Sequence, residues 1–233
     1  MQIIKQLFSS FLRLFYPKVC SVCGADLVEG EEVFCISCLY KIPLTRFWND
    51  KENPVAKIFW GRVNIENACA YFFFAKGSKY RPLLHKLKYK GEKEIGTALG
   101  LQFGQALKKS ELYSSIDFVV PVPLHPKKLR IRGYNQAEAI ADGIATGLGT
   151  KLSITHLLRT EFTETQTRKT RAERVKNVAE AFAVANKSEI EGKHLLLVDD
   201  VVTTGATLEA CAAKLLEVEN CKVSIAALAY ASL

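Results

Sequence analysis

The stretch LLLVDDVVTTGAT, residues 195–207, decides which fold the chain adopts. Its first four residues are apolar and predict a strand buried on both faces, as in a parallel sheet. A turn of small residues follows, and after it come apolar side chains at helical spacing: Leu208, Cys211, Ala212, Leu215 and Leu216. A strand, a tight turn and a helix in this order predict an α/β fold with a mostly parallel sheet.

Two acidic residues and a hydroxyl-rich turn stand where a ligand binds in such a fold. Asp199 and Asp200 come at the predicted end of the strand, and parallel α/β sheets bind ligands beyond the carboxyl ends of their strands. A helix N-terminus after Gly205 offers free N–H groups to a phosphate, and ionised carboxylates accept hydrogen bonds from sugar hydroxyls. Further donors are the hydroxyls of Thr203, Thr204 and Thr207. The pattern indicates a site for a sugar phosphate; the alternative is an ordinary strand-turn-helix with a capped N-terminus.

These thirteen residues resemble the signature of type I phosphoribosyltransferases, which bind 5-phosphoribosyl-1-pyrophosphate (PRPP) with Mg²⁺. The resemblance implies that Asp199 and Asp200 are the catalytic residues and hold the ribose 2′- and 3′-hydroxyls. It also implies that residues 203–207 cradle the 5′-phosphate, within a PRPP-binding turn made of Val201, Val202, Thr203, Thr204, Gly205, Ala206 and Thr207.

Composition sets the outer bounds. The chain has 233 residues, room for one sizeable domain and a small appendage, and 48% hydrophobic content is enough for a packed core. Its 32 basic and 24 acidic residues give a net charge of +8, which favours anionic partners, although an ordinary basic surface explains it equally. No apolar run reaches membrane-spanning length. The Walker phosphate-loop pattern is absent, which disfavours an ATPase motor.

Four cysteines near the start form two C-x-x-C pairs, Cys20 with Cys23 and Cys35 with Cys38, separated by eleven residues. Each pair can bind one metal ion from a tight turn, and four thiolates give tetrahedral Zn²⁺. With no spare ligand in view, the predicted zinc site is structural. The alternatives are disulfides or free thiols, and disulfides are rare in the cytoplasm.

Residues 4–15 place apolar side chains on one helical face, and Pro17 ends the predicted helix. Lys5 and Arg13 interrupt the apolar run, so the segment differs from a secretory signal and the chain is expected in the cytoplasm. We expect a soluble amphipathic helix that packs on its own domain. Peripheral membrane contact is the alternative.

The middle of the chain predicts further elements of the α/β domain. Residues 46–67 form a connector with interspersed aromatics, and residues 68–75 predict an outer strand. A short helix then leads to alternating lysines in residues 86–90, suited either to a phosphate or to a solvated helix end. Residues 92–109 predict a second amphipathic helix.

A second chemically informative stretch follows a predicted strand at residues 116–121. It contains three prolines, which stiffen the loop, and four cations before Gly133: Lys127, Lys128, Arg130 and Arg132. A helix is expected from about Gly133. Rigid backbone and positive charge at a helix start suit a pyrophosphate. His125 could act as a general base, but a lone histidine beside proline is more often structural.

A third stretch, residues 159–177, is long and polar and lies between predicted strands near 152–158 and 181–184. Long polar excursions from compact domains are often lids. The family resemblance implies a loop that closes over the substrate, in which Arg168, Lys169 and Arg171 would offset the charge of departing pyrophosphate. The alternative is a disordered surface loop.

The order of motifs narrows the resemblance. A Cys₄ module precedes LKYKG at 87–91, PVPL at 121–124, RGYNQA at 132–137, Thr167-Arg168, Arg174-x-x-Asn177 and then the acidic pair. This order resembles the ComF family of phosphoribosyltransferase-like proteins over nearly the whole chain. Members of that family are associated with natural competence, the uptake of single-stranded DNA.

The predicted architecture is a zinc ribbon on a Rossmann-like type I phosphoribosyltransferase domain. Residues 1–45 hold the amphipathic helix and zinc ribbon, 46–67 the connector and 68–233 the phosphoribosyltransferase-like domain. Strands near 118, 154, 182, 196 and 225 are expected to form the parallel core. The expected function is Mg²⁺-dependent phosphoribosyl transfer from PRPP to an unidentified acceptor. DNA-uptake proteins of natural competence are candidate partners. The competing hypothesis is a non-catalytic, PRPP-responsive protein that binds single-stranded DNA.

Overall fold

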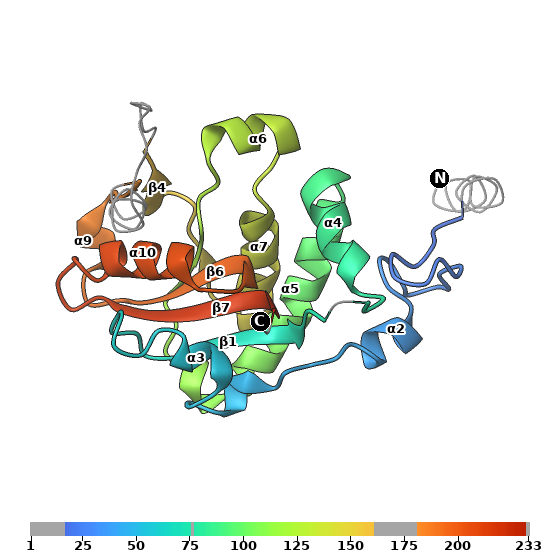
Figure 1. The fold of residues 1–233 in the computed structure, drawn as a ribbon, viewed down its shortest axis with the longest axis horizontal. Helices are drawn as coiled ribbons and strands as arrows, with labels where there is room; N and C mark the ends of the chain where they lie inside the picture. The colour runs from blue at the N-terminus through green and yellow to red at the C-terminus, as the bar shows by residue number, and fades with distance from the viewer. Residues whose placement is uncertain (1–16, 76, 161–180, 232–233) are drawn as a thin grey trace, which may run out of the picture.

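The stretch that decides the fold forms β6 (His194–Val202), the central strand of a five-stranded parallel sheet in the computed structural model. The structure describes residues 17–75, 77–160 and 181–231. The strand order is β1 (Ala68–Phe73), β7 (Lys222–Tyr230), β6, β2 (Phe118–Pro121) and β3 (Lys151–Leu152). Every paired strand of this sheet runs parallel to its neighbour, which confirms the predicted fold class (Figure 1).

Alternating side chains of β6 supply both hydrophobic layers. Leu196 and Val198 belong to one buried cluster, and Leu195 and Leu197 belong to the other. Successive side chains of a strand point to opposite faces, so a central strand covered on both sides must be apolar at every position. The continuous apolar run therefore encodes a sheet between two helical layers.

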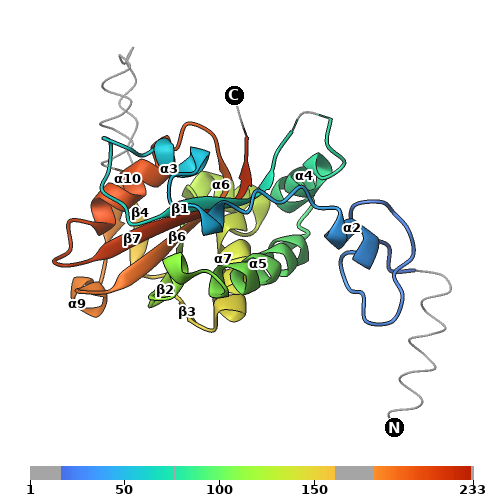
Figure 2. The same ribbon diagram turned by 90° about the horizontal axis from the view of Figure 1, so that it is seen from below.

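Helices from different parts of the chain cover the two faces (Figure 2). The first cluster contains side chains of α4 (Arg81–Tyr89), α5 (Lys93–Lys108) and α7 (Gln136–Leu148). The second contains side chains of α3 (Pro54–Lys57), α9 (Lys187–Ile190) and α10 (Ala206–Leu215). Short 3₁₀ helices at Phe47–Asn49 and Glu111–Tyr113 complete the connections.

Glycines let α5 and α7 approach until their backbones touch. A Cβ atom added at Gly100 would overlap the Ile140 carbonyl oxygen, and one added at Gly143 would overlap the Thr97 carbonyl oxygen. Gly104 and Gly147 meet the facing helix in the same way. Helices α5 and α7 therefore form a densely packed layer on the face of the sheet that includes β2 and β6. This layer holds in place the strand ends that carry the candidate site.

The outer edge of β1 is covered by the segment that precedes it. Phe73 N–H donates to the Pro43 carbonyl at 2.9 Å, and Thr45 N–H donates to the Tyr71 carbonyl at 3.0 Å. Further along, Asn53 Nδ2 donates to the Ala68 carbonyl at 2.7 Å. Backbone groups that an edge strand would leave free are therefore paired within the chain.

The structure corrects the predicted strand list. The strand expected near residue 182 is β5 (Phe182–Val184), which pairs antiparallel with β4 (Leu157–Arg159) in a separate two-stranded sheet and not in the parallel core. The strand expected near 154 is divided between β3 and β4. β4 and β5 have three residues each and pair with each other, so the strand near 182 does not join the parallel sheet.

The structure corrects one further expectation, and another falls outside the described residues. The proline-rich cationic stretch forms a helix, α6 (Pro126–Arg132), where only a loop was expected. The amphipathic helix expected at residues 4–15 lies outside the described residues. Within the parts of the chain that the structure describes, no helix combines the length and apolarity needed to cross a membrane.

Candidate ligand site and metal centre

The acidic pair, Asp199 and Asp200, lies inside β6 and not beyond the end of the strand. β6 continues to Val202, because Val201 and Val202 still pair with β7 at Ala229 and Tyr230. The structure adds a partner that the sequence did not reveal: Lys88 Nζ of α4 lies 2.9 Å from Asp200 Oδ2. The side chains of Asp200 and Lys88 remain 13% and 25% exposed, so a ligand can reach this pair.

The carboxyl of Asp199 has an unusual pKa. Burial and, after it, the neighbouring Asp200 carboxylate raise the pKa of its carboxyl to about 7, against the opposing effects of the Asp200 N–H and Lys88. That N–H donates to Asp199 Oδ1 at 2.8 Å. A carboxyl that gains and loses its proton near neutral pH is common in functional sites.

The turn after β6 is built for close approach of a ligand to the backbone. Gly205 has a φ of 74°, a left-handed conformation that favours glycine, and it precedes α10 without a side-chain cap. Thr203, Thr204 and Ala206 are exposed, Val201 and Thr207 are half-buried, and Val202 and Gly205 are buried. The first N–H groups of α10 have no acceptor within the helix, so they remain for a ligand or water.

The connector forms the back wall of this turn. A Cβ atom at Gly205 would lie 2.8 Å from Ile58 Cγ2 and 2.9 Å from Phe59 Cε1. Phe59 is fully buried, so it cannot move aside. Residue 205 is therefore restricted to glycine by both its conformation and its neighbours.

The cationic stretch begins beside the acidic pair. Pro121 is paired with Val198, and Val122 N–H donates to the Val198 carbonyl at 2.8 Å, so the chain leaves β2 next to Asp199. It then forms α6, whose N-terminus is capped by His125 Nδ1, an acceptor for Lys127 N–H at 3.1 Å. This contact supports the structural interpretation of His125.

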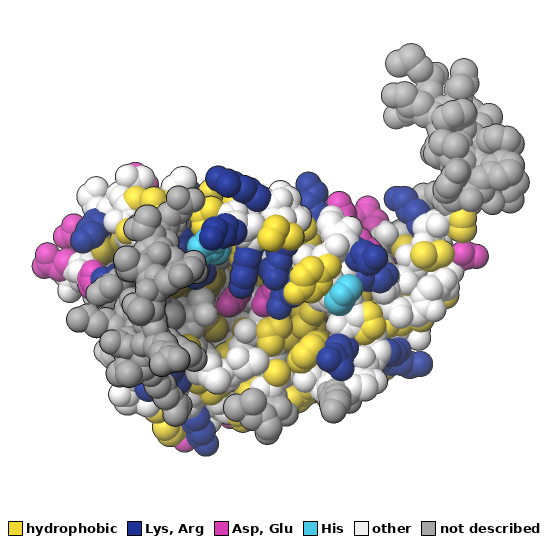
Figure 3. Space-filling model, turned by 45° about the horizontal axis from the view of Figure 1, so that its top comes forward, with side chains coloured by type: hydrophobic (Ala, Val, Ile, Leu, Met, Phe, Trp, Pro, Cys, Tyr) yellow, Lys and Arg dark blue, Asp and Glu magenta, His cyan; other side chains and the backbone are white. Residues whose placement is uncertain are grey.

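The four predicted pyrophosphate residues fall into two groups. Lys127, Lys128 and Arg130 are exposed on α6. Arg132 is half-buried, donates to Gln136 Oε1 at 2.5 Å and lies over the Tyr89 ring at 5.3 Å. Lys and Arg side chains gather on this face over α6 and α4 (Figure 3). This face therefore presents positive charge to solvent.

Hydrogen bonds join α4 to the start of α7. The Tyr134 hydroxyl donates to the Leu87 carbonyl, one residue before Lys88. Asn135 caps α7 by accepting from Ala137 N–H at 3.2 Å, and it donates to the Val122 carbonyl at 3.0 Å. These contacts place Lys88, Arg132 and the acidic pair around the carboxyl ends of β2 and β6.

The predicted lid residues Arg168, Lys169 and Arg171 lie outside the described residues. The structure does show where the two ends of that stretch meet. Leu157 to Arg159 pair with Phe182 to Val184, and Thr160 N–H donates to the Ala181 carbonyl at 3.0 Å.

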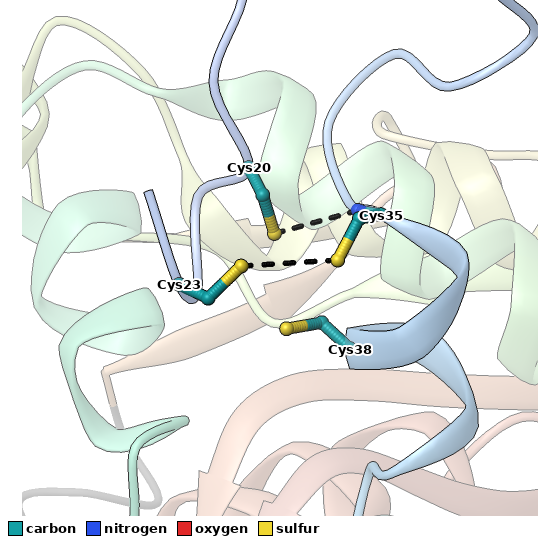
Figure 4. A group of neighbouring side chains, drawn as sticks. All are labelled: Cys20, Cys23, Cys35 and Cys38. Atoms are coloured by element: carbon teal, nitrogen blue, oxygen red, sulfur yellow. Dashed lines mark hydrogen bonds between the residues drawn. The ribbon is translucent and has the colours of Figure 1, made fainter. Parts of the chain in front are cut away.

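The four cysteines converge in a small module before the sheet (Figure 4). The sulfur atoms of Cys20, Cys23, Cys35 and Cys38 all lie within 4.8 Å of one another. Cys23 Sγ and Cys35 Sγ are 3.8 Å apart. Zn–S bonds of about 2.3 Å in a tetrahedron place sulfurs about 3.8 Å apart, so the cluster fits one such ion.

Backbone donors surround these sulfurs. Cys35 N–H donates to Cys20 Sγ at 3.4 Å. Although burial raises the pKa of the Cys20 thiol, hydrogen bonds from the backbone of Cys35, Cys23 and Val22 outweigh it and lower the pKa to about 6. Burial and hydrogen bonds with the neighbouring thiols raise the pKa of the Cys38 thiol to about 12, so the four groups do not all ionise on their own. Thiolates are the form that binds metal, and a bound cation would favour the ionised form of all four.

The cysteine module contacts α4. Tyr80 OH donates to the Cys38 carbonyl at 2.7 Å, and Lys86 Nζ donates to the Ser21 carbonyl at 3.2 Å. α4 therefore contacts the cysteine cluster at one end and the acidic pair through Lys88 at the other.

Comparisons with known proteins identify relatives of this chain. The phosphoribosyl transferase domain model matches residues 135–232. Competence protein ComFC of Bacillus subtilis is 33% identical over 201 residues, covering 86% of this chain and 78% of that protein. DNA utilization protein YhgH of Escherichia coli K12 is 32% identical over 139 residues, 58% of this chain, and the match spans 60% of its length.

Solved structures with a similar chain path were also found. Glutamine PRPP amidotransferase from B. subtilis has a TM-score of 0.42 and 19% identity, covering 61% of this chain and 30% of that one. A hypoxanthine phosphoribosyltransferase from Staphylococcus aureus has a TM-score of 0.34 and 20% identity, covering 59% of this chain and 64% of that one.

Proposed function

The chain belongs to the ComF family of phosphoribosyltransferase-like proteins, and we propose that it binds PRPP and transfers the phosphoribosyl group to an acceptor. One observation carries the proposal: β6 carries two adjacent carboxylates, Asp199 and Asp200, close to its end and leads into a glycine turn and the open N-terminus of α10. Carboxylates suit ribose hydroxyls, and the turn suits the 5′-phosphate.

The remaining groups fit the other end of PRPP. Lys127, Lys128 and Arg130 are exposed beyond β2 and would face the pyrophosphate, with Arg132 holding α6 against Tyr89. In the transfer, an acceptor lone pair forms a bond to the anomeric carbon, and the bond to pyrophosphate breaks with its electron pair leaving on oxygen. Positive charge grows on the ribose, which Asp199 and Asp200 would stabilise.

Mg²⁺ would accompany PRPP. Among the described residues the cysteine group is the one cluster of three or more metal-binding side chains, and its sulfur ligands do not suit Mg²⁺. Mg²⁺ is usually held by substrate phosphates with one or two carboxylates. Asp199 and Asp200 would supply these carboxylates, and the ion would neutralise charge on the leaving pyrophosphate.

For the four cysteines we propose one structural Zn²⁺. All four thiolates would be used, which leaves no open position for catalysis. A thiolate site of this kind is expected in a reducing compartment, in line with a cytoplasmic location.

Replacing both carboxylates tests the central assignment. Asp199→Asn with Asp200→Asn should abolish productive PRPP binding in a folded protein. Each lost charged hydrogen bond is worth about 1.5–3 kcal/mol, so titration calorimetry should show affinity reduced by roughly one to four decades. The exposed carboxylate of Asp142 on α7 provides the control, Asp142→Asn. Unchanged PRPP affinity in the double variant would remove the acidic pair as the ribose clamp.

Activity separates the enzyme from a binding protein. Incubation with PRPP, Mg²⁺ and a panel of bases, amines and nucleic acids should release pyrophosphate above background. Relatives named for competence and DNA utilization favour DNA as a partner, so the panel includes single-stranded DNA. Tight PRPP binding without turnover, together with salt-sensitive binding of single-stranded DNA, would favour the non-catalytic alternative.

A further inference from the structure

Arg62, in the connector, joins three chain segments around the turn after β6. Its Nη1 donates to the Ile58 carbonyl at 3.0 Å and to the Thr204 carbonyl at 2.9 Å. Its Nη2 forms an ion pair with Glu209 of α10. The planar guanidinium presents its donors in a fixed fork, so one side chain can hold all three acceptors at once.

Holding the Thr204 carbonyl also sets the direction of the next N–H group. The carbonyl of Thr204 and the N–H of Gly205 belong to one planar peptide, and in a trans peptide they point in opposite directions. Arg62 draws the carbonyl toward the connector, and the Gly205 N–H therefore points away from it. That direction leads to the open side of the turn, where Thr203 and Thr204 are exposed.

Arg62 also offsets a charge that would oppose an anion. Glu209 lies in the first turn of α10, where its carboxylate and a bound phosphate would repel each other. The ion pair with Arg62 neutralises this carboxylate. Arg62 thus favours phosphate binding in two ways, through the peptide orientation and through charge.

The position of Arg62 is itself fixed by buried neighbours. Arg62 N–H donates to the Phe59 carbonyl at 3.0 Å, and Phe59 is fully buried against Gly205. The connector therefore supports the turn by direct packing and by the guanidinium.

We propose that Arg62 is a positioning residue for the 5′-phosphate: it turns the Gly205 N–H toward the ligand and neutralises Glu209. This inference rests on the proposed PRPP function, because it assigns the turn after β6 to that phosphate. Arg62 touches the turn and not the reacting atoms, so its effect is on phosphate affinity.

Two ligands separate this effect from a general loss of structure. Ribose 5-phosphate carries the 5′-phosphate alone, and Mg²⁺-pyrophosphate represents the other end of PRPP. In calorimetry, Arg62→Ala should weaken ribose 5-phosphate binding by about tenfold to a hundredfold and leave pyrophosphate binding unchanged. The control Lys57→Ala removes the same charge from the exposed Lys57 of the same connector and should change neither.

Rescue variants test the two parts of the proposal. Arg62→Lys keeps the charge but not the fork, so its ribose 5-phosphate affinity should fall between wild type and Arg62→Ala. Glu209→Gln should restore part of the loss when added to Arg62→Ala, because it removes the carboxylate left unpaired. If Arg62→Ala does not fold, Arg62→Lys carries the same comparison, with ribose 5-phosphate affinity below wild type and pyrophosphate affinity unchanged.

The outcomes distinguish the two proposals. Wild-type protein that binds neither ribose 5-phosphate nor PRPP would overturn the proposed function. Wild-type protein that binds ribose 5-phosphate, with equal affinity in Arg62→Ala, would overturn the role of Arg62 alone. Equal loss for both ligands would also overturn it, because the effect would then be general.

Discussion

Replacing Asp199 by asparagine should stabilise the free protein while it removes the proposed ribose contact. The ordinary carboxyl pKa of 3.8 rises to about 7 in the folded protein, through burial and the Asp200 carboxylate. A pKa change of this size corresponds to about 4 kcal/mol between the two protonation states. The ionised carboxylate therefore destabilises the fold at neutral pH, and a neutral amide of the same shape does not.

The pH dependence has a definite sign. Between pH 3.8 and about 7 the folded state binds a proton on Asp199 that the unfolded state has lost. The unfolding free energy then falls as pH rises, by at most about 1.4 kcal/mol per pH unit for this group. Asp199→Asn lacks this decline, so its advantage over wild type should grow from near zero at pH 4 to about 4 kcal/mol at pH 8.

Urea denaturation of wild type and Asp199→Asn at intervals from pH 4 to pH 8 measures this difference directly. Protonation of the cysteine thiolates at low pH affects both proteins equally and cancels. Asp142→Asn, which removes an exposed carboxylate from α7, should follow the wild-type curve. Parallel curves for wild type and Asp199→Asn, or a less stable variant at pH 8, would refute the conclusion that Asp199 is a strained, ionisable group.

Two further predictions concern the metal module and the helix layer. Metal analysis should find one Zn²⁺ per chain, lost in Cys35→Ser but kept in Cys221→Ser, with the sheet still folded by circular dichroism; metal-free wild type would contradict this. Gly143→Ala should destabilise the fold by about 1–3 kcal/mol in urea, because the added methyl overlaps the Thr97 carbonyl, whereas the exposed Thr146→Ala should change little. Equal stability of both variants would mean that α5 and α7 separate easily.

The elements that sequence alone could predict are those encoded by a short continuous pattern. β6, its glycine turn and α10 lie within about twenty consecutive residues, and the apolar run of β6 requires cover on both faces. The cysteine spacing likewise defines its own cluster. The helix predicted at 92–109 is found as α5, because its apolar face repeats at helical spacing over several turns.

The features that the sequence did not reveal depend on contacts between distant residues. Lys88 meets Asp200 from another layer, and Arg62 meets Thr204 across 142 positions. The short strand β5 is apolar enough for the core, but pairing with β4 decides its place. For α6 a local signal existed: Pro126 at the first position after the capping residue His125 is a common helix start, and the cations obscured it.

The covered edge of β1 has a consequence for synthesis on the ribosome. Residues 43–53 emerge before β1, so the segment that closes this edge is already available when the strand appears. β7, the inner partner of β1, is made last. During elongation β1 therefore needs protection from other nascent chains, and a cap from its own earlier sequence provides it without waiting for the sheet. A chain that begins after residue 53 would lose this protection and should aggregate during translation.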